Sequence, residues 1–552
     1  ITILAKNTAI RWRDYRINIV DTPGHADFGG EVERVLSMVD SVLLLVDAVD
    51  GPMPQTRFVT SKAFERGLNP IVVVNKIDRD GARPDWVVDQ IFDLFDALGA
   101  NESQLDFPVV YTSAVLGIAG NDPATMAEDM TPLFEAIERH VPAPDVDIDG
   151  PLQLQISALD YSSYVGVIGV GRVTRGSVKG NTPVTIVDRA GDTRSGKILQ
   201  VMGYDGLERT EVSSADAGDI VCVTGIDGLL ISDTLCDPAQ PEALPALTVD
   251  EPTVSMTFQV NDSPFAGREG KYVTSRNLKE RLERELIHNV ALRVEPGDSA
   301  DKFKVSGRGE LHLSVLIENM RREGFELGVS RPEVIQKTID GAVCEPYEQL
   351  VLDIDEQHQG GVMEELGLRR AELAQLVLDG KGRVRLEFMV PARGLIGFRS
   401  QFLTMTSGSG IMTHIFDHYG PVTTAVLAAR QNGVLVSMVK GKSLAYALHA
   451  LQERGRLFLE PNIQVYEGQI VGLHSRGNDL VVNPTKAKQL TNVRASGTDE
   501  ALTLSPPVKH TLEQALEFIE EDELVEVTPE SIRLRKKWLL EHERKRASRS
   551  AA

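Results

Sequence analysis

The chain has 552 residues, 42% of them hydrophobic and 25% charged, which are ordinary proportions for a globular protein. That length predicts about four or five domains. The net charge of −22 excludes indiscriminate binding of nucleic acid by the whole surface, but it leaves room for local basic patches.

The cysteines and the hydropathy pattern bear on the cellular compartment. Cys222, Cys236 and Cys344 lack the spacing of a metal site, and we expect them to be buried free thiols in a reducing compartment. No signal peptide is visible, and the sequence has no run of about 18 apolar residues. We therefore predict a cytoplasmic protein without a membrane partner.

The first motif follows the apolar run of residues 17–20, which predicts a buried strand. This strand delivers Asp21 to a Pro-Gly turn, where the carboxylate can hold a hydrated Mg²⁺. Gly24 lets a backbone N–H approach a terminal phosphate, and His25 is placed to orient a water in line with that phosphate. The alternative is a plain strand-to-turn junction with a solvated Asp21 and a surface His25.

Three further apolar strands are predicted at residues 41–48, 71–74 and 108–111. The second runs into Asn75, which carries both a donor and an acceptor, and then into Asp78, which is acceptor-only when ionised. The two carboxylate oxygens of Asp78 can take the N1–H and the exocyclic N–H₂ of guanine together, whereas adenine offers neither donor on that edge. Asp78 therefore predicts a preference for guanine over adenine.

Neighbouring residues extend this candidate purine site. Lys76 has a long apolar stem that can lie along a base or ribose while its ammonium stays in water. Ser113 and Ala114, in the turn after the last of these strands, can offer a backbone N–H to a base carbonyl. The complete order of strands and turns is far more specific than any one of its motifs.

With these motifs in this order, the chain resembles a translational GTPase of the elongation-factor-G superfamily, and the match to the BipA (TypA) family is close. Residues 1–7 resemble the end of switch I, and residues 21–25 resemble switch II, with His25 in the place of the catalytic histidine. The resemblance implies GTP or GDP and Mg²⁺ as cofactors. It gives the metal-binding role to Thr2 and Asp21, and the guanine-specificity role to Asn75, Lys76 and Asp78.

The phosphate-binding loop of that family has no counterpart in these residues. The chain begins with Ile1 rather than Met, and no G-x-x-x-x-G-K-[ST] occurs in it. Without that loop, the N–H groups and the lysine that hold the β- and γ-phosphates are absent. We therefore expect an N-terminally truncated form of a GTPase, which by itself binds nucleotide weakly or not at all and is inactive.

Residues 1–147 predict an α/β GTPase domain that lacks this loop and most of switch I. Helical spacing alternates with the apolar strands, which implies a parallel sheet covered on both faces. Ligands bind such sheets at the carboxyl ends of the strands, where Asp21, Asn75 and Ser113 fall. The predicted helices are residues 31–38, 56–66, 86–98 and a last helix that begins at Thr131 and Pro132.

In the next two segments, the spacing of the apolar residues differs from that of the α/β domain. Residues 148–249 contain short strands broken by Gly and Asp turns, which predict a small antiparallel β-barrel similar to domain II of the family. Residues 250–332 predict a ferredoxin-like domain III, with helices at residues 275–287 and 310–323. We expect His312 to have a structural role. The expected barrel strands are residues 152–158, 166–172, 182–188, 194–202 and 219–224.

Residues 333–427 predict a second ferredoxin-like domain, similar to domain V of the superfamily. The connector of residues 393–399 carries Arg393, Arg399 and an aromatic residue near glycines, which suits contact with the backbone of ribosomal RNA. The alternative is a helix entry with solvated arginines. The expected strands are residues 349–354 and 383–390, and the expected helix is residues 362–378.

Residues 428–552 predict a mostly β C-terminal domain of the BipA type. It begins with a strand at residues 433–439, which leads into Gly441-Lys442-Ser443 and a helix. This imitates a phosphate loop, but Val436 stands where that motif needs its first glycine, and a Cβ there blocks the tight turn. We therefore expect no phosphate site in this domain.

Two basic segments of the C-terminal domain are candidates for RNA contact. The loop of residues 483–497 mixes cations, amides and hydroxyls that can follow phosphates, and it resembles the loop by which BipA proteins meet ribosomal RNA and the tRNA acceptor end. The RNA-binding residues expected there are Lys486, Lys488 and Arg494. The tail from Arg533 to Arg549 carries eight Lys or Arg, and its alternative is an ordinary solvated basic helix.

The predicted fold is a multidomain α/β and β protein with a GTPase domain, a β-barrel, two ferredoxin-like α+β domains and a mostly β C-terminal domain. The resemblance implies a ribosome-binding GTPase that hydrolyses GTP to GDP and phosphate in large-subunit assembly and in stress- or cold-adapted translation. We expect a monomer that contacts both ribosomal subunits through rRNA, and the tRNA acceptor end. The alternatives are a non-catalytic ribosome- or RNA-binding factor, and a translational GTPase like LepA or elongation factor G.

Overall fold

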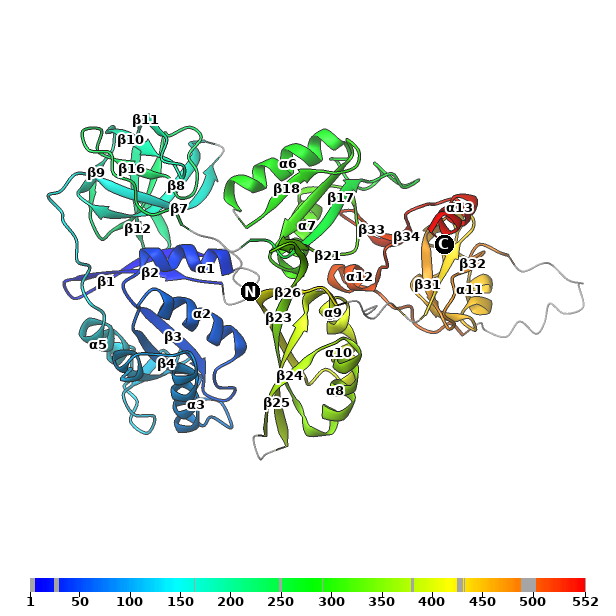
Figure 1. Cartoon of the computed structure of the whole chain (residues 1–552), viewed down its shortest axis with the longest axis horizontal. Helices are drawn as coiled ribbons and strands as arrows, with labels where there is room; N and C mark the ends of the chain where they lie inside the picture. Colours follow the sequence, from blue (N-terminus) through cyan, green and yellow to red (C-terminus); the bar gives the residue numbers. More distant parts are fainter. Residues whose placement is uncertain are drawn as a thin grey trace, which may run out of the picture. The chain divides into compact units, whose positions relative to one another are not determined.

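A computed structural model describes residues 5–23, 29–162, 164–247, 251–289, 291–378, 382–423, 430, 432–487 and 503–551 (Figure 1). Among the residues singled out above, Thr2, Gly24, His25, Lys488 and Arg494 lie outside these ranges. The chain divides into two compact units, one of residues 1–250 with 287–291 and one of residues 251–286 with 292–552. Within the described ranges, no helix is long and apolar enough to cross a membrane.

The sheet of the first domain is built from the apolar runs of the sequence. Its elements are β3 (Val42–Asp47), α2 (Pro54–Glu65), β4 (Pro70–Asn75), α3 (Pro84–Ala97), α4 (Glu102–Leu105), β5 (Val109–Ser113), β6 (Ile118–Gly120) and α5 (Thr131–His140). β3, β4 and β5 are parallel, and β6 runs antiparallel to β5. In β4, Val72 and Val74 pack with α3, whereas Ile71 and Val73 pack with α5 on the opposite face. The sheet is therefore covered on both faces, as predicted.

The strand that carries Asp21 does not join this sheet. β1 (Lys6–Trp12) and β2 (Tyr15–Asp21) form an antiparallel hairpin of their own, and α1 (Gly29–Val35) and the short η2 (Leu36–Met38) follow it. The backbone groups of β2 are paired with β1, and within the described residues no ladder joins β2 to β3. Within the described residues, the strand that carries Asp21 therefore belongs to a different hydrogen-bonded sheet from the strands that end at Asn75 and Ser113, and the placement of Asp21 beside those strand ends stays a prediction.

The second domain is a curled antiparallel sheet around a core of buried aliphatic side chains. Its strands are β7 (Gln153–Ser162), β8 (Gly166–Arg175), β9 (Ser177–Lys179), β10 (Pro183–Val187), β11 (Thr193–Lys197), β12 (Gln200–Asp205), β13 (Glu208–Glu211), β14 (Ser214–Asp216), β15 (Ile220–Thr224) and β16 (Thr234–Cys236). The strand predicted at residues 194–202 is two strands, because the chain changes partner from β10 to β15 between them. The β1–β2 hairpin packs on this domain, where Ala9 donates its N–H to the carbonyl of Gly206 at 3.3 Å.

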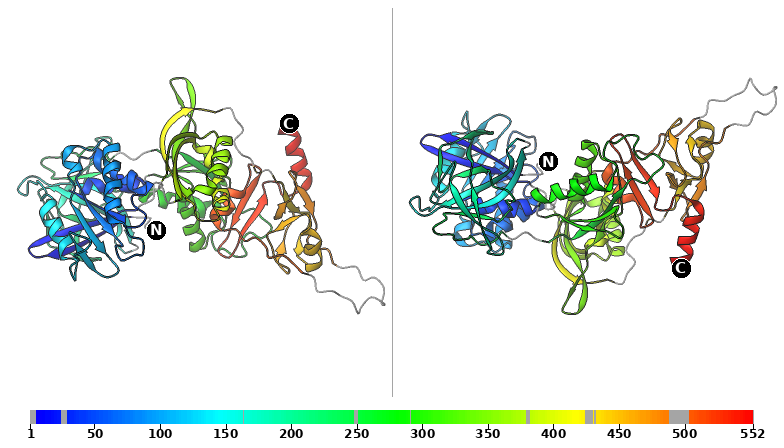
Figure 2. Two further views of the ribbon diagram at one scale, coloured as in Figure 1. Left: turned by 90° about the horizontal axis from the view of Figure 1, so that it is seen from below. Right: turned by 90° about the horizontal axis from the view of Figure 1, so that it is seen from above.

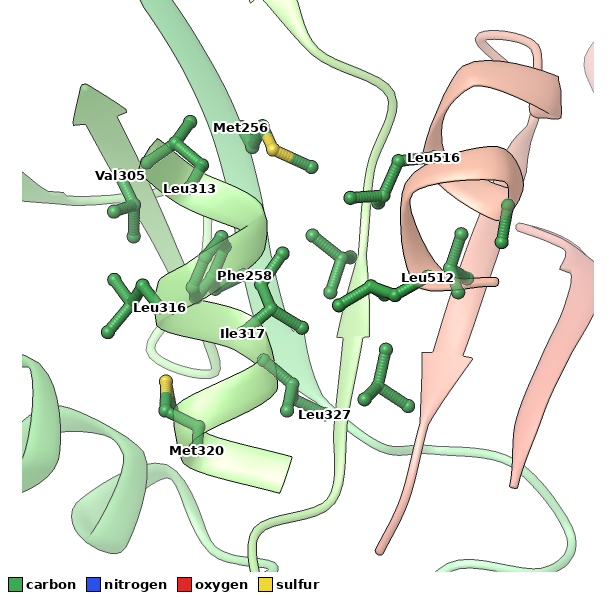
Figure 3. Packing of buried hydrophobic residues seen from close by; sticks show 14 of the residues in the cluster. Met256, Phe258, Val305, Leu313, Leu316, Ile317, Met320, Leu327, Leu512 and Leu516 are labelled. Carbon is green, nitrogen blue, oxygen red and sulfur yellow. The ribbon is translucent and has the colours of Figure 1, made fainter. Parts of the chain in front are cut away.

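The second unit begins with the predicted ferredoxin-like order. Its elements are β17 (Val254–Val260), α6 (Ser275–His288), β18 (Arg293–Pro296), β19 (Lys302–Gly307), α7 (Glu310–Glu323), β20 (Leu327–Val329) and the short β21 (Glu333–Val334). Leu313, Leu316, Ile317 and Met320 of α7 pack against the sheet (Figure 3). His312 is buried in the first turn of α7, as its expected structural role requires.

The C-terminal end of the chain completes this same sheet. β33 (Glu523–Val527) pairs with β20, and β34 (Ile532–Lys536) pairs with β33, so the order is β18-β19-β17-β20-β33-β34. Figure 2 shows the red C-terminal strands beside the green elements of this sheet. From α12 (Leu512–Phe518), Leu512 and Leu516 enter the same core as the buried side chains of α7 (Figure 3). Segments assigned from sequence to domain III and to the C-terminal domain thus share one sheet and one core.

A second ferredoxin-like sheet follows domain III. Its elements are β22 (Lys337–Ile339), β23 (Ala342–Asp355), η3 (Glu356–His358), α8 (Gln359–Leu368), β24 (Glu372–Leu378), β25 (Arg383–Pro391), α9 (Ala392–Leu395), α10 (Phe398–Met405) and β26 (Ile411–Pro421). The helix predicted at residues 362–378 is wrong in its second half. Arg370 adopts a left-handed φ of 63° after α8, and Leu376 and Leu378 then pair with β25 as part of an edge strand.

The Gly441-Lys442-Ser443 segment of the C-terminal domain is no phosphate loop. Around it lie β27 (Val434–Ser437), β28 (Gly441–Lys442), α11 (Ala445–Leu451), β29 (Gly455–Leu457), β30 (Gln464–Val465), β31 (Ile470–His474), β32 (Leu480–Val482) and, near the C-terminus, α13 (Glu541–Ala551). β28 pairs with β30. The Ser443 side chain is buried, and its hydroxyl donates to the Glu460 carbonyl at 2.7 Å and accepts from the Ile463 N–H at 3.0 Å.

Three of the eight cations of the basic tail lie in a strand rather than in a solvated helix. Arg535 and Lys536 of β34 expose 0% and 3% of their side chains, so each needs a nearby carboxylate. The carboxylates paired with the cations of β34 are Glu269 and Glu526 for Arg533, Asp262 for Arg535, and Asp479, Asp522 and Glu523 for Lys536. The helical alternative therefore applies only from α13 onward.

Glu523 is fully buried and lies against two of the cations of this unit. It accepts from the Arg430 guanidinium at 2.8 and 2.9 Å, from Lys536 Nζ at 2.9 Å and from the Glu520 N–H at 2.9 Å. Burial by itself raises the pKa of a carboxyl, but here the bonds and charges of the two cations outweigh it and lower the pKa of Glu523.

Glu523→Gln should lower the free energy of opening of β33 and β34 by about 3 kcal/mol, because it removes the carboxylate that binds the Arg430 guanidinium and one of the three carboxylates around Lys536. Hydrogen exchange of the β33 and β34 amides measures that free energy. Glu521→Gln is the matched control, since Glu521 is exposed two residues away.

The sign of the pH dependence follows from the lowered pKa of Glu523. The stabilisation by its carboxylate is present above the ordinary pKa of 4.5 and is lost as the pH falls through the lower value of the folded state. The difference between the unsubstituted chain and Glu523→Gln should therefore narrow below pH 4.5. A difference that is independent of pH would contradict this account.

Candidate functional site

The parallel strands of the GTPase domain bring three polar residues to one edge of the sheet. β3 ends at Asp47, β4 at Asn75 and β5 at Ser113. Asp47 lies opposite Asn75 in the ladder, and Asn75 lies opposite Thr112. The carboxyl edge of a parallel sheet is where loops converge on a ligand, so this edge is the candidate site.

The side chain of Asn75 ties the loop after β4 to the loop after β5. Its Oδ1 accepts from the Thr112 hydroxyl at 3.1 Å and from the Ala114 N–H at 3.1 Å. We expected the Ala114 N–H to donate to a base carbonyl, but in this structure it donates to the side chain of Asn75. Ser113 is fully buried, and its hydroxyl accepts from the Leu116 N–H at 3.3 Å, so it shapes the turn.

Asp47 makes the corresponding connection between the loops after β3 and β4. Its Oδ2 accepts from Lys76 Nζ at 2.8 Å and from the Arg79 guanidinium at 3.1 Å. Its Oδ1 accepts from two backbone N–H groups of its own loop. Burial opposes ionisation of Asp47, but the bonds from Lys76 and from the backbone outweigh burial and lower the pKa of Asp47.

The stacked side chains of Arg83 and Trp86 contact the loop after β3. The guanidinium of Arg83 lies 3.5 Å from the centre of the Trp86 ring and donates to the Val49 carbonyl at 3.3 Å. Gly51 has a φ of 72°, and a Cβ at this position would come within 2.8 Å of Trp86. Only glycine fits this turn without strain, so the loop that carries Asp47 has a defined path.

The sequence reasoning found Asn75, Lys76 and Asp78 but gave no role to Asp47 or Arg79. A strand ending in Asp is too common a pattern to mark a site, and only the parallel register places Asp47 beside Lys76. Asp78 is exposed in the loop after β4, and Asp21 is exposed at the end of β2. Within the described residues, no cluster of three or more His, Cys, Asp or Glu could hold a metal ion.

Comparison with known proteins assigns the segments to families. Residues 1–143 match the elongation factor Tu GTP binding domain, residues 342–430 the elongation factor G C-terminus, and residues 432–541 the TypA/BipA C-terminal domain. The chain is 67% identical over 550 residues to the large ribosomal subunit assembly factor BipA of Escherichia coli (strain K12), covering 100% of this chain and 91% of that protein. The protein of the same name from Haemophilus influenzae is 66% identical, with 100% and 89% covered.

This chain belongs to the BipA family. It is accordingly a translational GTPase with a guanine-nucleotide-binding domain, which sets aside the LepA and elongation-factor-G alternatives. A crystal structure of a protein from Thermus thermophilus matches with a TM-score of 0.51 at 17% identity, covering 77% of this chain and 90% of that chain. At that identity the likeness shows a shared fold alone.

The arginines that we expected at an RNA surface of this BipA-family chain differ in exposure. Arg393 forms two hydrogen bonds, at 2.7 and 3.2 Å, with the fully buried carboxylate of Glu345. Arg399 is exposed on α10, and Lys486 is exposed after β32. The remaining predicted RNA ligands, Lys488 and Arg494, lie outside the described residues.

Asn75→Ala should loosen the loop after β5, because the Ala114 N–H loses the oxygen to which it donates. We expect hydrogen exchange at Ala114 to accelerate by about tenfold, the size of one lost hydrogen bond. Asn69→Ala, just before β4 at the other end of that strand, is the control. Equal exchange in Asn75→Ala and in the unsubstituted chain would contradict the bond seen here.

Proposed function

We propose that the carboxyl edge of β3, β4 and β5 is the GTP and GDP site of a BipA-family GTPase, which couples hydrolysis of GTP to large ribosomal subunit assembly. The observation that supports it most is the 67% identity, over the whole chain, to a BipA protein named for that assembly role. The geometry of the edge fits the nucleotide part of the proposal, because Asn75 and Asp47 hold the loops around it.

The base would be selected by Asp78. Its exposed carboxylate can accept the N1–H and the exocyclic N–H₂ of guanine together. Asn75 would support the base pocket through its amide group and through the Ala114 loop that it holds. Such a division, with one residue that selects and another that holds the loop, is a common solution in binding sites.

Thr2 and Asp21 would hold Mg²⁺ at the phosphates, since one or two protein oxygens suffice for an ion that keeps most of its waters. When bound, Mg²⁺ neutralises charge on the β- and γ-phosphates. His25 would orient the attacking water when the ribosome presses the switch segments into place, and hydrolysis would release them. Gly24 would bring a backbone N–H to the terminal phosphate.

The ribosomal partner would be recognised through RNA phosphates. Arg399 and Lys486 are exposed and can neutralise phosphate charge, together with Lys488 and Arg494 of the same C-terminal loop. Arg393 would act by holding the connector rather than by touching RNA, because its guanidinium is bound to Glu345. Contact with the tRNA acceptor end and a role in stress- or cold-adapted translation follow from the family resemblance.

We further propose that the protein acts as a monomer in the cytoplasm. Ribosome assembly takes place there, and Cys222, Cys236 and Cys344 are buried free thiols, as suits a reducing compartment.

His25→Ala should abolish ribosome-stimulated hydrolysis, by at least about 100-fold, while GDP affinity stays nearly unchanged, because the histidine acts on water and not on the base. The measurement is GTP turnover with and without large ribosomal subunits. It is made on this chain and on the chain extended upstream by the phosphate-binding loop of a BipA relative. Equal stimulated rates in the extended His25→Ala and His25 forms would overturn the proposal.

Arg399→Ala should weaken binding to ribosomes several-fold and reduce the slope of affinity against salt concentration by about one, as expected for one lost phosphate contact. Arg276→Ala is the control, because it removes an arginine that is 86% exposed on α6. Arg393→Ala should instead lower stability, since it leaves Glu345 buried without its cation. Loss of ribosome affinity with an unchanged salt slope would count against Arg399 as a phosphate ligand.

A further inference from the structure

The contact between Asp47 and Lys76 is more than a surface ion pair. The Asp47 side chain is 13% exposed, whereas the Lys76 side chain is 51% exposed. Every hydrogen bond described for the Asp47 carboxylate comes from its own loop or from the loop after β4. Asp47 is therefore a fixed and mostly buried anchor, and Lys76 is the more exposed partner.

The backbone at Lys76 is shaped for this contact. Lys76 has a φ of 66°, in the left-handed region that residues with a Cβ rarely occupy. Such strain persists where surrounding contacts over-determine the conformation. Here the neighbouring contacts are the bond from Lys76 Nζ to Asp47 and the bonds to Asn75 from the β5 loop.

The anchor determines where the apolar part of Lys76 lies. Its Cα follows β4, and its ammonium is held at the end of β3, 2.8 Å from Asp47 Oδ2. The four methylenes must therefore run between the ends of these two neighbouring strands, beside Asn75. A lysine stem fixed at both ends offers a flat apolar strip on which a purine ring can rest.

We propose that Asp47 is a positioning residue for nucleotide binding, which holds the ammonium of Lys76 so that the Lys76 stem forms one face of the purine pocket. The role rests on the proposed nucleotide site. Asp47 acts through Lys76 and touches neither base nor phosphate. Arg79 completes the neutralisation of Asp47 from the outer side.

This arrangement separates affinity from selectivity. The stem supports any purine equally, because it meets the ring face and not the edge that distinguishes the bases. Asp78 reads that edge. Removal of the Asp47 charge should therefore weaken the binding of guanosine, inosine and xanthosine diphosphates by the same factor, whereas Asp78→Asn should change their ranking, because an amide can donate to the C2 carbonyl of xanthine.

The binding experiment compares Asp47→Asn, Asp47→Glu and Asp50→Asn in the chain extended upstream by the phosphate-binding loop of a BipA relative. Asp50 is the matched control, since it is a neighbouring acid in the same loop with its side chain 50% exposed. We expect Asp47→Asn to weaken all three diphosphates by roughly tenfold, the size of one charge-assisted hydrogen bond. Asp47→Glu should restore part of the loss, and Asp50→Asn should bind as the unsubstituted chain does.

A second measurement needs no nucleotide. The rate at which a small acylating reagent modifies Lys76, followed by mass spectrometry of the peptides, reports how firmly its ammonium is held. Lys76 should react several-fold faster in Asp47→Asn, whereas the rate at the exposed Lys486 stays constant as an internal reference. An unchanged rate at Lys76 would show that the anchor does not exist in solution and would overturn the proposal.

The outcomes separate this role from the proposed function. Faster acylation of Lys76 in Asp47→Asn with unchanged affinity for the three diphosphates would overturn the positioning role and leave the nucleotide site intact. Affinity that falls for guanosine diphosphate alone would also overturn it, because the stem would then not act on the ring face. Failure of the extended, unsubstituted chain to bind any of them would overturn the proposed function itself, whatever the acylation rates.

Discussion

A carboxylate that leaves water must be met by cations or N–H donors, and this requirement governs how the second unit is assembled. Glu523 and Glu526 are fully buried, and much of their compensation comes from Arg533 and Lys536 of β34. Glu526 also accepts from Asn261, Ser263 and Tyr466, which belong to other segments of the unit. β20 therefore gains its second strand partner, and the buried carboxylates gain their cations, only when β33 and β34 are in place.

The same rule operates at the proposed nucleotide edge, where the carboxylate and its cation differ in exposure. Glu523 and its cations are almost entirely buried, which fixes β33 and β34 in one arrangement. Asp47 is nearly buried, but its partner Lys76 is half exposed, so only one side of that contact is fixed. A site that must admit and release a nucleotide needs a rigid anchor and an accessible partner, whereas a structural core needs both partners buried. The exposure of the cation therefore distinguishes a carboxylate that anchors a binding site from one that holds a structural core together.

Sequence reasoning succeeded where one local pattern determines the outcome. The apolar runs of β3, β4 and β5, and the order of Asn75 and Asp78 behind β4, follow from the chain itself. It failed where the outcome depends on distant partners. The composition of β24 is typical of a helix, but this segment forms a strand because it pairs with β25. The sequence around β34 predicts solvated cations, because the carboxylates that pair with Arg533 and Arg535 come from distant segments. Asp47 was missed for the same reason, because only the parallel register of β3 and β4 gives it Lys76.

The arginines around the connector of residues 393–399 show how burial changes the meaning of one residue type. Arg369 is 4% exposed and donates to the carbonyls of Gly394 and Ile396, which fixes the path of the connector. Arg393 is bound to Glu345, and Arg399 is exposed. If this connector binds RNA as proposed, it loses little conformational freedom on binding, so each phosphate contact costs less in entropy than it would in a free segment. A count of arginines would therefore overstate the number of proposed phosphate ligands, because Arg369 and Arg393 are bonded within the protein and only Arg399 is exposed.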